Sequence, residues 1–289
     1  MGEAGSDVAA QAAAAVRILS VSRVAPSPLG ENHGRGRLKL SLFDTPWVVL
    51  PPIQRVFLYE LGQGGSGEEG FPAVVERLKR ALADTLAHYL PLAGRLQYVA
   101  ETGDVFVDYS DDAGVAFVEA EGDDIDVRRL AGEEKHDIPA FLSLVPELDA
   151  RALPAPVLSV QATRLGANGL AVGLSVHHAV ADGRAVWRFM EAWASASREG
   201  SPVTKALGPP HYGRDAVAQP DDDELGRDML KTVAPNLPAV SSFVYVVSSV
   251  AATMLTVCLI QDDTGLHGTN FSSMPKQSSS QSSNGVTAS

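Results

Sequence analysis

A single cysteine, Cys258, occurs among the 289 residues, which excludes a framework of disulfides within the chain and is typical of a reducing compartment. Basic residues are also few, since 23 Lys and Arg against 35 Asp and Glu give a formal net charge of -12. Nucleic acids and anionic membranes repel such a chain, so neither is expected as its main partner. A polyanionic ligand would need a local basic patch.

The N-terminus lacks the positively charged segment and the apolar core of a secretory signal, so we expect a cytoplasmic protein. Residues 243–260 are uncharged and about as long as the shortest transmembrane helix, which makes a tail anchor one interpretation of this run. Against it, the run holds four Ser or Thr residues, has no Lys or Arg close by, and is rich in Val and Thr, as strands are. A membrane is therefore not expected as a partner.

In the stretch 170–183 the spacing of apolar residues changes from that of a strand to that of a helix. Large apolar side chains alternate in its first half, while small or polar ones share the other face, which predicts a strand over 170–176 with one well-packed face. From Asp182 the period becomes helical, at Val186, Phe189, Met190, Trp193 and Ser197. Asp182 is a good N-cap and Gly200 a good stop, so we expect a helix over 184–198.

Further elements follow from the same two periods. A helix with Pro72 in its first turn is expected over 72–90. The Asn168-Gly169 pair predicts a hairpin into the strand at 170–176. Alternating apolar residues predict the remaining strands, at 16–24, 38–42, 57–61, 105–109, 115–119 and 157–164.

His177, His178 and Asp182 lie on the turn between the central strand and its helix, where catalytic residues are often found. An imidazole can take a proton from a hydroxyl or an amine, so His178 is a candidate general base. Adjacent residues at a strand end point to opposite faces, so we expect His178 to border a cleft and His177 to turn inward. Asp182 could orient the imidazole, or it could turn away, cap the helix and pair with an arginine. Two half-buried histidines without a chemical role are the simplest alternative.

Several segments, taken in order, carry a resemblance to a known family. They are D-T-P-W (44–47), P-P-I-Q-R-V-F-L-Y (51–59), Y-L-P-L-A-G-R-L (89–96), V-Q-A-T (160–163) and H-H-A-V-A-D-G-R-A (177–185). The last looks like the H-x-x-x-D-G signature of the plant BAHD acyl-CoA-dependent acyltransferases, and the first two resemble their anthocyanin and flavonoid glucoside branch. The resemblance covers residues 16–240, and the family's second hallmark, D-F-G-W-G, is absent.

This resemblance implies an α/β fold: a mixed β-sheet with covering helices, like the N-terminal domain of the chloramphenicol acetyltransferase-like, coenzyme A-dependent acyltransferases, followed by an incomplete second domain. It also implies acyl transfer from an acyl-CoA to a hydroxyl or amine of a plant secondary metabolite such as a phenolic or flavonoid glycoside. His178 would deprotonate the acceptor, and Asp182 would fix the turn through an arginine contact. Acyl-CoA would be a co-substrate, with no tightly bound cofactor and no metal.

The domain organisation follows from composition and from the family pattern. We expect an N-terminal acyltransferase-like domain over 1–200, a Pro- and Gly-rich crossover linker over 201–240 and an incomplete second domain over 241–262. By resemblance, 243–260 would be the first helix of that domain, left without its partners. Residues 263–289 are expected to be a disordered tail, because the chain there is rich in Ser and has little to bury. A monomer is expected unless 243–260 drives association.

Three functions from different classes stay open. The first is the acyltransferase with His178 as base. The second is a catalytically inactive truncated relative that acts as a binding module, because the family's second half supplies the other wall of the active-site channel. The third is a metal-dependent hydrolase using His177, His178 and Asp182. It is disfavoured because a catalytic zinc site usually needs a third His or carboxylate with suitable spacing, beyond adjacent residues of one turn.

Overall fold

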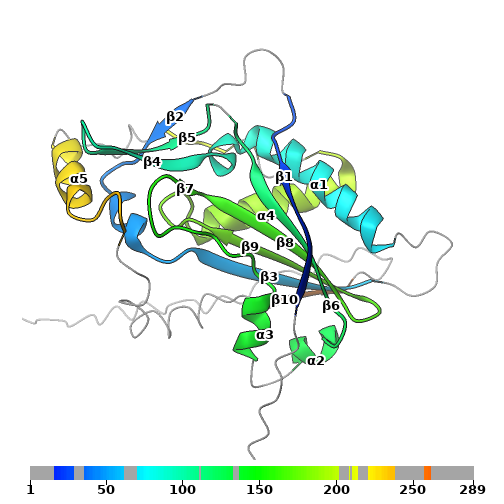
Figure 1. Cartoon of the computed structure of the whole chain (residues 1–289). Helices are drawn as coiled ribbons and strands as arrows, with labels where there is room; N and C mark the ends of the chain where they lie inside the picture. The colour runs from blue at the N-terminus through cyan, green and yellow to red at the C-terminus, as the bar shows by residue number, and fades with distance from the viewer. Residues whose placement is uncertain are drawn as a thin grey trace, which may run out of the picture.

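A six-stranded sheet and a four-stranded sheet form the protein (Figure 1). The computed structural model describes residues 16–28, 36–61, 70–110, 112–132, 137–201, 208, 210–213, 221–237 and 257–261. The large sheet has the order β1 (Arg17–Val24), β6 (Val115–Gly122), β8 (Leu158–Leu165), β9 (Gly169–Val176), β3 (Ile53–Glu60), β10 (Val257–Gln261). Two of its pairs, β6 with β8 and β3 with β10, are parallel and the others antiparallel, so the sheet is mixed, as predicted.

Two long helices cover one face of the large sheet. Figure 1 shows α1 (Phe71–His88) and α4 (Gly183–Glu199) side by side behind it. Their apolar stripes join the sheet residues in one core cluster, which confirms the predicted helical periods. The predicted ends of α4 are also confirmed, because the Asp182 carboxylate accepts a hydrogen bond from the Ala185 N–H at its start and Gly200 takes a left-handed conformation with φ of 73° at its end.

The opposite face of the sheet is covered as well, which the sequence did not predict. All eight residues of β9 are buried. The helices α2 (Val127–Gly132) and α3 (Ile138–Ser143) pack there, followed by the chain at 144–146. A Cβ at Gly173 would lie 2.0 Å from the Leu144 carbonyl oxygen, and the Ser175 hydroxyl donates to the Pro146 carbonyl at 2.6 Å. The second face of β9 thus consists of small residues because backbone passes directly over it.

The four-stranded sheet has its own core and its own helix. Its order is β2 (Arg37–Lys39), β5 (Asp104–Asp108), β4 (Arg95–Val99), β7 (Ala155–Pro156), and the 3-10 helices η1 (Thr45–Val49) and η2 (Leu90–Ala93) lie in the flanking segments. The helix α5 (Asp222–Lys231) lies within the range predicted as a linker. It is anchored by a hydrogen bond of 2.8 Å from Arg227 Nε to the nearly buried Asp104, whose carboxylate also lies 3.2 Å from the Lys39 Nζ.

The segment 243–260 differs from the expected helix at its described end. Residues 257–261 form strand β10, which runs parallel to β3 at the edge of the large sheet. Residues 243–256 and the predicted tail at 263–289 lie outside the described residues. Within the described part of the chain, no helix is long and apolar enough to cross a membrane.

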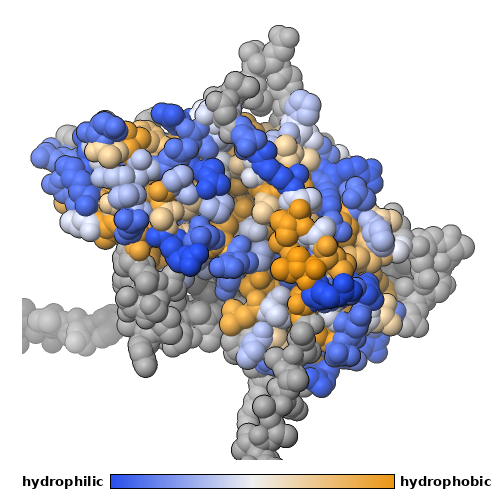
Figure 2. All heavy atoms as spheres, viewed as in Figure 1, coloured by the Kyte–Doolittle hydropathy of each residue, from blue (hydrophilic) through white to orange (hydrophobic). Residues whose placement is uncertain are grey.

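The outer edge of the large sheet exposes apolar side chains. Among the residues that the structure describes, strand β1 pairs with β6 on one side and with no strand on the other. On it Ile18 and Val21 are 61% and 64% exposed, and Figure 2 shows apolar side chains gathered on the face of the molecule where Figure 1 places β1. The two glutamates that border this patch, Glu119 and Glu121, are paired with Lys79 and Arg17, respectively.

Candidate active site

The turn between β9 and α4 carries the predicted site residues. It leaves the sheet at His177, whose backbone N–H donates to the Val157 carbonyl at 2.9 Å, and it closes with a bond of 3.0 Å from the Val180 N–H to the His177 carbonyl. Ala179 is buried in the core of the four-stranded sheet, whereas Val180 packs against the cores of both sheets. The turn is therefore held between the two sheets, which fixes the position of its side chains.

His177 points into the protein, as predicted from strand alternation. Its side chain is fully buried, and its Nδ1 accepts a long hydrogen bond of 3.3 Å from the Ala179 N–H. Burial, and secondarily the neighbouring His178, lower the pKa of His177 to about 4. This imidazole is therefore neutral at physiological pH and is packed where no substrate reaches it.

His178 is half-buried, and its ring lies against an indole. The ring centroids of His178 and Trp47 are 4.3 Å apart with an angle of 15° between the planes, a stacked pair. The Nδ1 atom of His178 is buried without a hydrogen-bond partner among the residues that the structure describes. Of the two adjacent histidines, His178 is thus the one that retains exposure, as a general base requires.

Asp182 caps the helix. Its Oδ1 accepts a hydrogen bond of 2.7 Å from the Ala185 N–H, the third residue along. Within the described ranges, Asp182 forms no ion pair with an arginine and no hydrogen bond with His178. Of the two interpretations from sequence, the geometry therefore agrees with the helix cap; the arginine contact implied by resemblance is not seen in this part of the chain.

Trp47 is the residue of this site that sequence reasoning missed. Its D-T-P-W segment was informative only as part of a family resemblance, and no periodicity places an aromatic side chain of η1 against a turn so far along the chain. The available signal was the rarity of the residue, because Trp47 is one of three tryptophans in the sequence.

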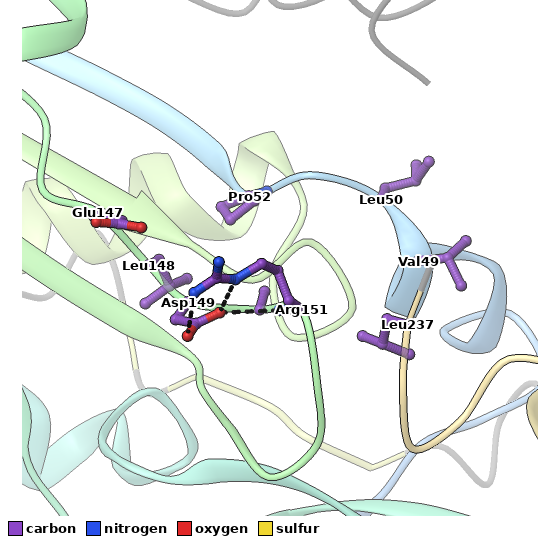
Figure 3. Close-up of a pocket in the computed structure, with 9 residues that line it drawn as sticks. Val49, Leu50, Pro52, Glu147, Leu148, Asp149, Arg151 and Leu237 are labelled. Atoms are coloured by element: carbon purple, nitrogen blue, oxygen red, sulfur yellow. Dashed lines mark hydrogen bonds and ion pairs between the residues drawn. The ribbon is translucent and has the colours of Figure 1, made fainter. Parts of the chain in front are cut away.

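A small pocket lies beside the same 3-10 helix (Figure 3). It has a volume of about 170 Å³ and is lined by Val49, Leu50, Pro52, Glu147, Leu148, Asp149, Ala150, Arg151 and Leu237. Arg151 and Asp149 pair with each other within it, and hydrogen bonds from Arg151 lower the pKa of Asp149 to about 2. Pockets that bind drug-sized ligands have volumes of roughly 300–1,000 Å³, so this pocket is too small for coenzyme A. His178 does not line it, and a cleft at the His178 ring stays a prediction.

The metal-dependent alternative finds little support in the geometry. His177 is buried with one ring nitrogen already engaged, and Asp182 is used as a cap. In the parts of the chain that the structure describes, no group of three or more His, Cys, Asp or Glu side chains could hold a metal ion. The three candidate ligands of the turn are therefore not arranged as a catalytic zinc site would require.

Comparison with known proteins identifies the family. The model of the Transferase family matches residues 14–239. A malonyl-CoA:anthocyanidin 5-O-glucoside-6''-O-malonyltransferase of Arabidopsis thaliana is 36% identical over 62% of this chain and 38% of its own length. Phenolic glucoside malonyltransferase 1 of the same plant is 31% identical over 72% of this chain and 44% of its own length. A malonyl-coenzyme A:anthocyanin 3-O-glucoside-6''-O-malonyltransferase of Dahlia pinnata is 30% identical over 78% of this chain and 51% of its own length.

A solved structure confirms the fold. The crystal structure of vinorine synthase superimposes with a TM-score of 0.55 at 21% identity, covering 71% of this chain and 47% of that one. The mixed sheet with covering helices is thus the expected coenzyme A-dependent acyltransferase fold. The chain spans about half or less of the length of the relatives it matches. With the family model matched over residues 14–239, the chain belongs to the Transferase family, that of the plant BAHD acyl-CoA-dependent acyltransferases.

Proposed function

We propose that this chain is the histidine-bearing half of an acyl-CoA-dependent acyltransferase that acylates a hydroxyl group of a phenolic or flavonoid glycoside, with His178 as general base. The observation that carries the proposal is the contrast within the histidine pair. His177 is buried and neutral, while His178 retains exposure on a rigid turn between two sheets. A general base must be fixed in position and yet open to substrate, and the held turn and the partial exposure of His178 support this role.

The chemistry needs one proton relay. A ring nitrogen of His178 takes the proton of the acceptor hydroxyl as its oxygen attacks the carbonyl carbon of the acyl-CoA thioester. The tetrahedral oxyanion then collapses, the carbon–sulfur bond breaks, and the proton on His178 passes to the departing coenzyme A thiolate. The products are an ester and free coenzyme A, and His178 is again neutral. Neither a metal nor a covalent acyl-enzyme is needed.

Asp182 has a structural role in this proposal. By capping α4 through the Ala185 N–H it fixes the end of the turn, and the turn sets the position of the His178 backbone. Its carboxylate is not needed for the proton transfer, because it makes no hydrogen bond to the imidazole within the described residues.

The substrates are proposed from the relatives' names. The anthocyanidin, phenolic glucoside and anthocyanin enzymes named above are all malonyltransferases, and a coumaroyl-CoA:anthocyanidin glucoside coumaroyltransferase of Arabidopsis thaliana is 28% identical. We therefore expect malonyl-CoA or a hydroxycinnamoyl-CoA as acyl donor and a glycoside hydroxyl as acceptor. No nucleic acid or membrane is expected to take part, and we expect a cytoplasmic protein that is a monomer unless residues 243–260 drive association.

The inactive binding module is the second candidate, and the small pocket of the described residues favours it. The described residues offer a pocket of about 170 Å³, and the chain matches between 38% and 51% of the relatives' lengths. A site for acyl-CoA therefore needs further walls. We expect little or no transfer from the 289 residues alone and transfer once a second half is supplied.

The test is reconstitution. The chain is co-expressed with the C-terminal half of the Arabidopsis thaliana phenolic glucoside malonyltransferase 1 and assayed with malonyl-, coumaroyl- and acetyl-CoA against phenolic and anthocyanin glucosides. That enzyme's own two halves, split at the same place, serve as positive control. Transfer by both pairs supports the proposal, whereas transfer by the control pair alone would favour the inactive binding module.

A further inference from the structure

Trp47 lies against the candidate base, and its role goes beyond the proton transfer already described. We infer that Trp47 is a positioning residue of this site: its indole holds the His178 imidazole by stacking and stabilises the positive charge that the ring gains when it takes the acceptor's proton. This inference rests on the proposed function, in which His178 is the base.

Trp47 and His178 form a close, stacked pair of rings. Trp47 and His178 lie 4.3 Å apart and almost parallel, at 15°. The other aromatic pairs in the described part of the chain are 5.5 to 6.3 Å apart and inclined by 35° to 76°, as is usual in a packed core. The contact between Trp47 and the imidazole is therefore closer and more parallel than in those three pairs of the described residues.

Stacking on the Trp47 indole orients the imidazole of His178. Within the described residues His178 has no hydrogen-bond partner for its buried Nδ1 and no ion pair. Catalytic histidines are commonly oriented by a hydrogen bond to the nitrogen that does not react. Here the Asp182 carboxylate, which could have served, is bound to the Ala185 N–H. Stacking against the indole face then limits rotation of the imidazole.

The backbone that carries the Trp47 indole is held in place by its neighbours. Asp44, just before η1, accepts hydrogen bonds of 2.8 Å from the Ser41 N–H and hydroxyl. The Thr45 hydroxyl donates to the Leu42 carbonyl at 2.7 Å, and Val48 is buried in the core of the four-stranded sheet. The Trp47 backbone is therefore held on both sides, so its ring can act as a wall for a neighbouring side chain.

The Trp47 indole also bears on the charge that His178 gains. His178 becomes a cation during the proposed reaction. Two carboxylates of the segments that carry the pair have other partners: Asp44 accepts from Ser41, and Asp182 accepts from the Ala185 N–H. His177 beside it is neutral. The face of an indole attracts a cation, and tryptophan does so more strongly than phenylalanine. Leucine is apolar but smaller and has no ring face to attract a cation, which predicts the order Trp, Phe, Leu for turnover.

The test has one arm without activity and one with it. In the 289-residue chain, NMR signals of the His178 ring carbons and protons should carry the ring-current shift of the indole. Trp47→Leu should remove this shift and Trp47→Phe should keep part of it. The control is Phe43→Leu, because Phe43 is 61% exposed on the same segment and should leave the His178 signals unchanged.

The activity arm uses the reconstituted enzyme. Trp47→Leu should lower kcat about tenfold or more with KM within about twofold, because the base is misplaced while substrate binding persists; Trp47→Phe should recover most of kcat. Circular dichroism and thermal unfolding show that each variant is folded. Unchanged His178 signals or unchanged kcat in Trp47→Leu would overturn the inference alone, whereas no transfer by the wild-type pair, beside an active control pair, would overturn the proposed function.

Discussion

His177 and His178 are neighbours in the chain but lie in opposite environments. The alternation of a strand end sends one ring into the protein and leaves the other half-buried beside Trp47. This difference could be predicted from the sequence, because it depends only on the pattern of β9. The Trp47 contact could not, because it joins η1 to a turn far along the chain and depends on how the two sheets meet.

The buried His177 predicts a dependence of stability on pH. Its pKa is about 4 in the folded protein, below the ordinary value of 6.5 for a histidine, so between these values the unfolded chain binds the proton and the folded one does not. The free energy of unfolding should therefore fall with decreasing pH by roughly 1.4 kcal/mol per unit, about 2 kcal/mol between pH 7 and pH 5. Urea unfolding at several pH values measures it.

The control for this prediction is His177→Asn, whose amide oxygen can still accept from the Ala179 N–H but does not titrate. The carboxylates with a lowered pKa, such as Glu119 with an ordinary value of 4.5, lose their contribution to the free energy of unfolding only as the pH falls below that ordinary value. An equal pH dependence in His177→Asn and in the wild type between pH 5 and pH 6.5 would contradict the assignment.

The helix cap at Asp182 predicts a second effect on stability. Asp182→Ala removes the acceptor of the Ala185 N–H and should cost about 1 kcal/mol, because a free N–H is left at the start of α4. Asp182→Asn keeps an acceptor oxygen and should be close to the wild type. Thermal unfolding of the two variants decides, and equal losses in both would show that the charge of Asp182 matters more than the cap.

At the scale of elements, β9 shows what the sequence pattern left open. The alternation predicted a strand with one packed face, and that face is in the core with α1 and α4. The small residues of the other face were consistent with exposure, yet they are buried because the chain at 144–146 passes over them. Small side chains allow both a solvent face and close backbone contact, so composition alone could not distinguish the two.

This close contact predicts that Gly173 accepts no side chain. A Cβ there would lie 2.0 Å from the Leu144 carbonyl oxygen, so Gly173→Ala must displace backbone and should cost about 1–3 kcal/mol or more. Gly132→Ala is the matched control, because a Cβ at Gly132 meets nothing within 4 Å. Urea midpoints measure both, and the account of β9 would be wrong if Gly173→Ala were as stable as the control.

Helix α5 was hidden from sequence reasoning for a different reason. It lies in a Pro- and Gly-rich range, and its contacts are to distant segments. Leu230 is buried in the core of the four-stranded sheet, Arg227 binds Asp104 at 2.8 Å, and Asp223 lies 2.7 Å from the Lys39 Nζ. Burial acts to raise the pKa of Asp104, but hydrogen bonds from Arg227, Thr102 and Lys39 outweigh it and lower that pKa. Such pairs depend on tertiary structure, which no local pattern reveals.

For the whole molecule, the described residues form two sheets with the histidine turn held between them, and the chain matches about half or less of its relatives. The fold class, the long helices and the histidine pair could be predicted from periodicity and family resemblance. The strand at 257–261 could not, because the resemblance implied a helix there, although the Val and Thr content of the run was typical of a strand.

His178 is proposed as the base of a half-site that becomes active when completed. The most direct test is turnover by the reconstituted pair carrying each histidine variant. His178→Ala should lower kcat about a hundredfold or more, because it removes the proton acceptor. His177→Asn should stay within about threefold of wild-type kcat while losing stability, because it affects packing alone. Turnover by folded His178→Ala close to the wild type, or equal losses in both variants, would contradict the account.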